Sequence, residues 1–362
     1  MTYGDCHGGQ RAATVRPGQD VVTSDPRTDA RWRQLALGPH GSLFTSPPWL
    51  EAVCATYGFD PVCRITSDAG APLAGLAWVP ISDLRGARRI SLPFSDRADP
   101  SVDDAVSWAA LRRTVVGPDA PFTLRCFDTA VPAADPHLER VGAAAWHGTP
   151  LDTGLDALHR RLSKPARRNI ALAERAGVRI EADTGLDAVR RFHELHVQLR
   201  KRKYRLLAQP VGLFERIWHA FAADAGMVTL LARVGDELIA GAMFLVWGDT
   251  LYYKFGASRS ERLSLRPNDA IFWAGIRWAV ARGLRRLDWG LSDLDQPGLV
   301  AYKRKWATEE GTIVTLRAGG EQAHPPGDAG PMLSELTRLL TADSVPDAVT
   351  TQAGALLYRY FC

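Results

Sequence analysis

Long hydrophobic runs are missing from this sequence. The longest uncharged apolar run extends from Leu238 to Gly248, far short of the roughly 20 residues that a membrane-spanning helix requires. No charged start followed by an apolar stretch, the pattern of a secretory signal, precedes the first predicted elements. We therefore expect a cytoplasmic protein with neither an integral membrane segment nor a secretory signal.

Cysteine is also scarce, and its spacing argues against two kinds of structural site. The five cysteines are scattered singly, with no C-x-x-C pair. This spacing is typical of reduced thiols in a cytoplasm rather than of a disulfide framework or a zinc site. The residues concerned are Cys6, Cys54, Cys63, Cys126 and Cys362.

The common catalytic motifs are absent as well. The sequence contains no P-loop, no G-x-G-x-x-G after a strand, no G-x-S-x-G and no H-E-x-x-H. His193 and His196 lie three residues apart in a predicted helix, which resembles half of a metal site, but no further ligand follows at a suitable spacing. We interpret both as residues at the polar edge of an amphipathic helix, and we expect no metal.

The composition is that of an ordinary globular protein with an uneven distribution of charge. Its 362 residues are 46% hydrophobic and 23% charged, which suffices for a sizeable core, and the length indicates two domains. The net charge is +4, yet residues 160–205 contain 14 Lys/Arg against 5 Asp/Glu, so the remainder is acidic. Such a basic segment is typical of a site for a polyanion: nucleic acid, anionic lipid or a phosphorylated small molecule.

The order of predicted elements repeats once along the chain. Residues 1–28 lack apolar periodicity and are interpreted as a flexible tail. An N-terminal domain (29–150) and a C-terminal domain (151–317) each show a helix, antiparallel strands, a helix and a strand, and a linker with a C-terminal helix that docks on the body follows (318–362). The predicted helices cover residues 48–57, 102–114, 155–162, 164–176, 186–203, 214–225, 268–283 and 332–340, and the strands 61–65, 73–81, 89–92, 122–127, 178–182, 227–234, 238–247, 250–257 and 284–289.

The elements from Met227 to Trp289 resemble the core of GNAT acyltransferases. In that fold the diphosphate of acetyl-CoA binds backbone N–H groups of a Q/R-x-x-G-x-G/A loop ahead of a helix. Here the loop contains no glycine between Gly256 and Asn268, and side chains hinder close approach of a backbone to a diphosphate. We therefore expect an α+β protein with two tandem GNAT-like domains, each a mixed, mainly antiparallel sheet flanked by helices, without the usual CoA-binding loop.

Several stretches together resemble the Fem family of aminoacyl-tRNA-dependent transferases, over most of the chain and in the family's order. The resemblance is closest to the broad Fem-like branch, since no inserted helical arm is seen. It implies that an ester-linked amino acid moves from aminoacyl-tRNA to an amine or other nucleophile on an acceptor, either a peptidoglycan precursor or a small-molecule intermediate of natural-product biosynthesis. The stretches are Leu43–Leu50, Ser91–Asp96, Ser163–Ile170, Gly298–Trp306 and Leu357–Tyr360.

Three residues are candidates for the chemistry. Attack of an amine on an aminoacyl ester creates an oxyanion, which a fixed cation stabilises. Lys303 resembles the lysine of the family's F-K motif, with Tyr302 in the aromatic place, where a ring can hold the ammonium by a cation–π contact. The alternative is that Lys303 belongs to a solvated basic run. Asp96 is the candidate proton acceptor, although the family's carboxylate aligns loosely and also fits Asp99 or Asp103, and the alternative is a capping residue in a turn.

A second set of candidates would bind phosphates of the tRNA acceptor arm or of an acceptor diphosphate. Lys164 and two arginines share one helix face at i, i+3 and i+4, in the first turns, where backbone N–H groups favour anions. An aromatic ring beside the second basic run could stack on a terminal base. The alternative for the whole set is a solvated face. Its members are Arg167, Arg168, Arg200, Lys201, Arg202, Lys203, Tyr204, Arg205 and Lys305.

Three rival functions stay open. The first is an N-acyltransferase of the same fold that uses acetyl-CoA through an atypical loop. The second is a non-catalytic scaffold, and the third is a plain RNA-binding module. The main interpretation needs no cofactor besides the co-substrate aminoacyl-tRNA. It also predicts that Asp288, Trp289 and Gly290, at the end of a strand, line the acceptor pocket.

Overall fold

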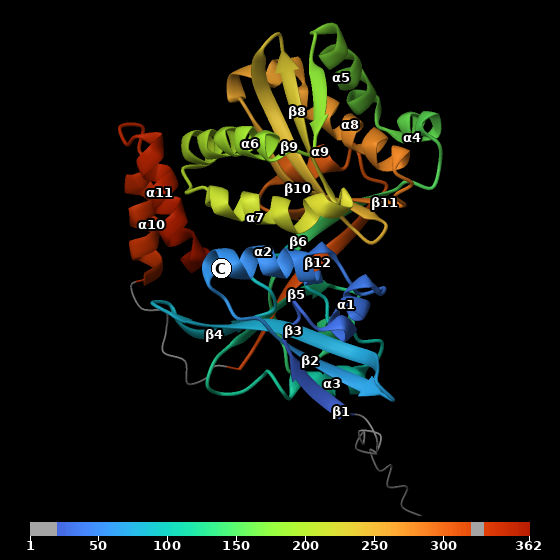
Figure 1. The fold of residues 1–362 in the computed structure, drawn as a ribbon, viewed down its shortest axis with the longest axis vertical. Helices are drawn as coiled ribbons and strands as arrows, with labels where there is room; N and C mark the ends of the chain where they lie inside the picture. Colours follow the sequence, from blue (N-terminus) through green and yellow to red (C-terminus); the bar gives the residue numbers. More distant parts are fainter. Residues whose placement is uncertain (1–19, 320–328) are drawn as a thin grey trace, which may run out of the picture.

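The computed structural model describes residues 20–319 and 329–362, and within these ranges twelve strands form one continuous sheet. The strand order is β1-β2-β3-β4-β5-β12-β6-β11-β10-β9-β8-β7. Helices cover both faces of the sheet, and the two halves of the chain lie end to end (Figure 1). The α+β fold with two mainly antiparallel GNAT-like units is therefore confirmed.

The N-terminal half contributes six strands and three α-helices. The elements are β1 (Asp20–Ser24), α1 (Ala30–Leu37), η1 (Leu43–Thr45), α2 (Pro47–Tyr57), β2 (Val62–Asp68), β3 (Ala71–Asp83), β4 (Gly86–Ile90), α3 (Ala105–Arg112), β5 (Phe122–Phe127), η2 (Val131–Ala134) and β6 (Glu139–Pro150). The start of α2 shows how local sequence fixes an element. Ser46 accepts a hydrogen bond from the N–H of Trp49, Pro47 occupies the first helical position, and Gly58 ends the helix at φ +67°.

The C-terminal half contains the remaining strands and the helices that pack on them. The elements are α4 (Leu155–Arg161), α5 (Lys164–Arg175), β7 (Arg179–Asp183), α6 (Leu186–Leu199), the π-turn η3 (Arg200–Tyr204), α7 (Val211–Phe221), η4 (Ala222–Asp224), β8 (Met227–Val234), β9 (Glu237–Trp247), β10 (Thr250–Ser258), η5 (Ser260–Leu265), α8 (Pro267–Ala281), β11 (Arg286–Asp293), α9 (Pro297–Lys303), β12 (Glu309–Ala318), α10 (Ala329–Leu340), α11 (Asp347–Leu357) and η6 (Tyr358–Phe361).

Two strands pair with strands of the other half. β6, from the N-terminal half, pairs with β11, and β12, from the C-terminal half, inserts between β5 and β6. The prediction placed a domain boundary at residues 150/151 and assigned neither strand. The boundary stays a prediction, but the sheet runs through it without a break.

The prediction that residues 1–28 form a flexible tail is wrong for residues 20–24. Residues 20–24 form the edge strand β1, which pairs antiparallel with β2, Val22 lying opposite Ile65. Five residues are too few to show an apolar period, and the pairing partner is distant in sequence. Residues 1–19, with Cys6, lie outside the described residues, as does most of the predicted linker.

Two large hydrophobic cores lie on opposite faces of strands β8–β10. On one face, residues of α2, α6 and α7 pack together around Phe192 and Phe214. On the other, α5 and α8 pack around Phe272 and Trp289. The first core includes residues from both halves of the chain, so it fixes the halves relative to each other.

Candidate active site at the junction of the two halves

The loop after β4 carries the first candidate, Asp96. Leu92 and Phe94 in this loop both have φ +59°, a left-handed conformation that costs a residue other than glycine on the order of 1–3 kcal/mol. The ring of Phe94 packs against Tyr57 and Tyr358, with centroids 4.6 and 5.4 Å away. Strain held by surrounding packing is characteristic of functional loops.

The parallel strands β10 and β11 diverge at the point that this loop reaches. They pair over three residues, and Tyr252 opposite Asp288 is the last pair. Directly afterwards β10 shifts its register with β9, and β11 shifts its register with β6 around Gly290, whose φ is +72°. Such irregularities re-aim side chains and backbone groups. They direct Lys254 of β10 and the backbone around Gly290 toward Asp96.

Asp96 bridges the two diverging strands. Its Oδ1 lies 2.7 Å from Nζ of Lys254, and its Oδ2 accepts a hydrogen bond of 3.1 Å from the N–H of Leu291. A Cβ on Gly290 would lie only 2.7 Å from Oδ2, so the arrangement requires glycine. Burial raises the pKa of Asp96, but Lys254, the N–H of Leu291 and Lys303 outweigh burial and hold it below its usual range.

Lys303 lies on the other side of the same strand segment. Its Nζ donates to the carbonyl oxygens of Gly290 (3.1 Å) and Leu291 (2.8 Å), and only 3% of the residue is exposed. Burial lowers the pKa of Lys303 to about 8, although the carboxylates of Asp96 and Asp288 act in the opposite direction. The ammonium group is thus held in place and close to neutralisation at physiological pH.

The expected contact between Tyr302 and Lys303 is wrong. The ring of Tyr302 packs against Phe272 at 5.2 Å, and the cation above it is Lys305, with Nζ 5.4 Å from the centroid. Neighbouring residues at the end of a helix point in different directions and do not face each other. Lys303 is instead fixed by backbone carbonyls.

Lys254 is a member of the site that the sequence analysis missed. Besides Asp96, its Nζ lies 4.5 Å from the ring centroid of Phe44 and 5.1 Å from that of Trp49. Aromatic faces stabilise an ammonium in such a position. The available signal was a single lysine in the otherwise uncharged strand β10.

Of the three aligned carboxylates, Asp96 is the one whose charge raises the pKa of Lys303. Asp99 is buried, pairs with Arg97 at 2.5 Å and accepts the N–H of Phe127 at 2.9 Å. Asp103 is exposed and lies 2.7 Å from His40. Both carboxylates therefore form contacts within the N-terminal half.

Two members of the predicted phosphate-binding run hold the C-terminal helices. Lys201 is buried and donates to Val345 O and to Asp347 at 2.7 Å. Arg205 forms two hydrogen bonds, of 2.7 and 2.9 Å, with Asp343. These contacts dock α10 and α11 onto the end of α6, which gives both side chains a role within the chain.

The other members of that run differ in their surroundings. Arg200 donates to Leu207 O at 3.0 Å and lies above the ring of Tyr358. Arg202, Lys203 and Tyr204 are exposed, and Arg202 and Lys203 line a cavity of about 310 Å³ together with the loop that follows β10. Phosphate binding by these residues stays a prediction.

The first basic pair lies elsewhere. Arg167 and Arg168 belong to α5, which packs on α8 through Ile170 and Ala173 and through a 3.2 Å hydrogen bond from Asn169 to Asp269. Neither arginine forms an ion pair with a described residue. The structure therefore separates this pair from the run at the end of α6, and its role also stays a prediction.

A cavity of about 730 Å³ lies beside the loop that carries Asp96, on the β5–β12 face of the sheet. Thr123 and Arg125 of β5 stand opposite Arg317 and Thr315 of β12, so two arginines and two threonines alternate across the strand pair. Neither of these arginines forms an ion pair with a described residue. We call this the arginine cavity.

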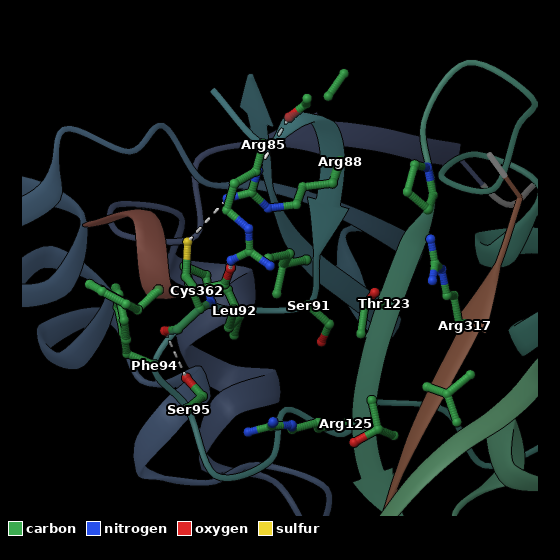
Figure 2. A pocket seen from close by; sticks show the side chains of 18 of the residues that line it. Arg85, Arg88, Ser91, Leu92, Phe94, Ser95, Thr123, Arg125, Arg317 and Cys362 are labelled. Atoms are coloured by element: carbon green, nitrogen blue, oxygen red, sulfur yellow. Dashed lines mark hydrogen bonds between the residues drawn. The ribbon is translucent and has the colours of Figure 1, made fainter. Parts of the chain in front are cut away.

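The opposite wall of the arginine cavity is also basic. Figure 2 shows Arg85 and Arg88 across the cavity from Thr123 and Arg317. Arg88 pairs with Asp83 at 2.8 Å, and Arg85 donates to backbone oxygens of the terminal segment. Asp119 is the one acidic residue of the lining, so the cavity favours an anionic ligand.

The two helical histidines are buried against Phe214, so their assignment to the polar edge of the helix is wrong. The polar partner of both rings is Gln209. Nε2 of His193 lies 3.0 Å from Gln209 O, and Nε2 of His196 lies 2.7 Å from Gln209 Oε1. Burial lowers the pKa of His196 to about 3. Within residues 20–319 and 329–362 there is no cluster of three or more His, Cys, Asp or Glu side chains suited to a metal ion, and no helix there is long and apolar enough to span a membrane.

Comparison with known proteins agrees with this architecture. The family model described as "Acetyltransferase (GNAT) domain" matches residues 160–304. The structure of FemX superimposes with a TM-score of 0.63 at 15% identity, over 82% of this chain and 96% of FemX. The chain has a Fem-like tandem GNAT fold.

A second tandem GNAT structure extends the comparison. A tandem GNAT protein from the clavulanic acid biosynthesis pathway, solved without AcCoA, gives a TM-score of 0.50 at 12% identity, over 84% of this chain and all of that one. No curated protein matches this sequence. At these identities the likeness establishes the tandem GNAT fold.

Proposed function

We propose that this Fem-like tandem GNAT protein transfers an amino acid from aminoacyl-tRNA to an amine or other nucleophile on an acceptor. One observation carries the proposal: where β10 and β11 diverge, a carboxylate from the N-terminal half, Asp96, pairs with Lys254 of the C-terminal half and interacts electrostatically with the buried ammonium of Lys303. Aminoacyl transfer needs both a proton acceptor and a fixed cation.

In this reaction the incoming amine attacks the ester carbonyl, its proton passes to Asp96 or to water, and the ribose oxygen leaves. The pKa of Asp96 lies below its usual range, so it is ionised and can accept that proton. Lys303 stabilises the oxyanion or the leaving oxygen. Since aminoacyl-tRNA is its donor, the reaction belongs in the cytoplasm.

The start of α8, which follows the loop without glycines between Gly256 and Asn268, supports tRNA over CoA as the donor. Arg266, in the position before α8, has φ +58°, and Asp269 in its first turn is 4% exposed. Burial raises the pKa of Asp269, and Asn169 donates to it. A carboxyl group at a helix N-terminus occupies the place where a diphosphate would otherwise bind the backbone N–H groups.

The acceptor, in this proposal, enters through the arginine cavity. Its volume of about 730 Å³ is in the range of small-molecule sites, and its arginines and threonines suit a phosphate or carboxylate. The cavity shares the loop of Leu92 and Phe94 with the Asp96 centre. Both a peptidoglycan precursor and a phosphorylated or carboxylated small molecule meet this requirement.

The test incubates the purified protein with radiolabelled aminoacyl-tRNAs and a cell extract as the source of acceptors. We expect label to leave the tRNA for a new product, and RNase and Lys303→Met to abolish this transfer. Arg304→Gln is the matched control, because Arg304 is the exposed neighbouring cation and pairs only with Glu310. Label that remains on the tRNA with every extract would contradict the proposal.

A second candidate is an acyl-CoA-dependent N-acyltransferase, which the GNAT family match over residues 160–304 favours. It predicts transfer from labelled acetyl-CoA in a parallel reaction, insensitive to RNase. Transfer from acetyl-CoA alone would replace the aminoacyl-tRNA proposal with this one.

A further inference from the structure

A second cavity, of about 490 Å³, lies on the other side of the Asp96 loop. Its wall includes Arg97, the residue that follows Asp96, and its floor is formed by β10 and β11 just before they diverge. The segment between α1 and η1 closes one side. We call it the Asp288 cavity, after the residue on which its chemistry depends.

Sheet register places an acid and an aromatic ring side by side on the floor. Asp288 and Tyr252 form the last pair of β10 and β11, so their side chains project from the same face. Gly148 of β6 stands opposite Asp288, and a Cβ there would lie 2.4 Å from Cη2 of Trp146. The indole of Trp146 therefore lies across the backbone beside Asp288.

The two cations that line the cavity are paired with other acids, and neither forms a direct ion pair with Asp288. Arg97 pairs with Asp99 at 2.5 Å and stacks on the ring of Phe127 at 4.4 Å, and Arg286 pairs with Glu309 at 3.1 Å. Asp288 forms no ion pair with any described residue.

The side chain of Asp288 is nevertheless buried. The residue is 3% exposed, and Oδ1 accepts the N–H of Gly290 at 2.7 Å. Burial raises the pKa of Asp288. Arg97 and the indole of Trp146 counteract the effect of burial only in part. A buried carboxylate with no direct ion pair is costly, and a cation that enters the cavity would offset that cost.

The walls select the kind of cation. Four aromatic residues, Phe127, Trp146, Trp247 and Tyr252, contribute to the lining together with one buried acid, Asp288. Hard metal ions require several oxygen ligands, whereas an organic ammonium is stabilised by a single carboxylate and aromatic faces. A small organic group fits a volume of about 490 Å³.

We propose that the Asp288 cavity binds an organic ammonium group, with Asp288 as its counter-ion and Tyr252 and Trp146 as its aromatic walls. The inference rests on the proposed function, in which two groups have this chemistry: the α-ammonium of the aminoacyl ester and the amine of the acceptor. Arg97 of the cavity wall follows Asp96 in the chain, and the floor of the cavity ends where β10 and β11 diverge toward the Asp96 centre.

The test is a calorimetric titration of the full-length protein with small probes in the absence of tRNA. Alaninamide carries an α-ammonium beside a carbonyl, butylamine carries an alkyl ammonium, and propionamide and butanol are their neutral counterparts. We expect an ammonium probe to bind at least about tenfold more tightly than its neutral counterpart, as expected for a charged hydrogen bond. Preference for alaninamide assigns the site to the aminoacyl group, and preference for butylamine assigns it to the acceptor.

Two isosteric variants locate the binding. Asp288→Asn should weaken the ammonium probe about tenfold or more, whereas Asp293→Asn, an exposed residue of the same strand, should leave it unchanged. Equal binding of charged and neutral probes, no binding of any ammonium probe, or unchanged affinity in Asp288→Asn would each overturn the inference.

The result is separable from that of the proposed function. If ammonium probes bind but no amino acid leaves tRNA, the aminoacyl transfer proposal fails and the ammonium site stands. If transfer occurs at the wild-type rate in a folded Asp288→Asn variant, the transferase proposal stands and this inference fails.

Discussion

Lys303 and Lys254 approach one carboxylate from different elements, and their surroundings differ. Lys303 donates to two carbonyl oxygens of β11 and is 3% exposed, whereas Lys254 lies against Asp96 and the faces of Phe44 and Trp49. The first lysine is fixed by backbone, and the second is fixed by a charge. We therefore expect substitutions of Lys303 and of Lys254 to change different measurable properties of the protein.

The pKa of about 8 for Lys303 gives the transfer reaction a pH limit. The ammonium form stabilises developing negative charge, and this form is lost as the pH rises through the pKa. We expect the single-turnover rate of transfer to fall above pH 8 in the wild type. In Lys303→Arg, whose guanidinium stays charged, any residual activity should show no such fall. A wild-type rate that keeps rising through this range would contradict the assignment.

Lys254→Met should remove the counter-ion of Asp96. Breaking a largely buried pair by removing one partner costs about 3 kcal/mol or more, so the free energy of unfolding should drop by about that amount. Because Lys254 lowers the pKa of Asp96, its loss should also shift the acid limb of the transfer profile to higher pH. Lys254→Arg keeps the charge and should restore the position of that limb. An unshifted acid limb in Lys254→Met would show that Asp96 does not depend on this lysine.

Among the helices and strands, the sequence predicted best those elements whose conformation depends on their own residues. The predicted strands 122–127 and 227–234 coincide with β5 and β8, because apolar runs with clear ends define them. β6 contains three consecutive alanines and two glycines and owes its conformation to pairing with β11 and β12, so its sequence carries little signal. The partners of Lys201 and Arg205 are likewise about 140 residues away.

The sequence predicted only those residues of the candidate site that lie in recognisable local motifs. Asp96 and Lys303 were named from short motifs, and they lie in one centre. Lys254 was missed because its role arises from an irregularity of β10 and from an acid in the other half of the chain. The arginine cavity was missed because β5 and β12 become neighbours only through the strand exchange.

Gly290→Ala tests how the β11 irregularity positions Asp96. The substitution places an alanine at φ +72° and a Cβ 2.7 Å from Asp96 Oδ2. Gly248→Ala is the matched control, since its φ is +60° and no atom lies within 4 Å of the added Cβ. Backbone strain alone costs about 1–3 kcal/mol, so both variants should lose that much stability to denaturant. Only Gly290→Ala should also lose transfer activity, and equal activity in the two variants would refute the positioning role.

At the scale of the whole molecule, one sheet runs through the described residues, and the candidate site is composed of side chains from both halves. Asp96 comes from the N-terminal half, both lysines come from the C-terminal half, and β6 and β12 join the two units. Each GNAT-like unit thus depends on its neighbour for a strand, and the candidate site takes side chains from both.

Separate expression of the halves measures that dependence. A fragment of residues 1–150 lacks β12, so the edges of β5 and β6 that pair with β12 are uncovered. We expect this fragment to show no cooperative unfolding transition. Co-expression with residues 151–362 should restore a soluble complex. Independent cooperative unfolding of residues 1–150 would show that the shared sheet is not required.

The position of β12 also determines when the protein can fold during its synthesis. The N-terminal half is translated first, but the strand between β5 and β6 is the last of the sheet to leave the ribosome. The nascent half therefore waits, with two strand edges uncovered, until more than 300 residues have been made. Such edges bind other extended chains, so the N-terminal half is exposed to mispairing until β12 has been made.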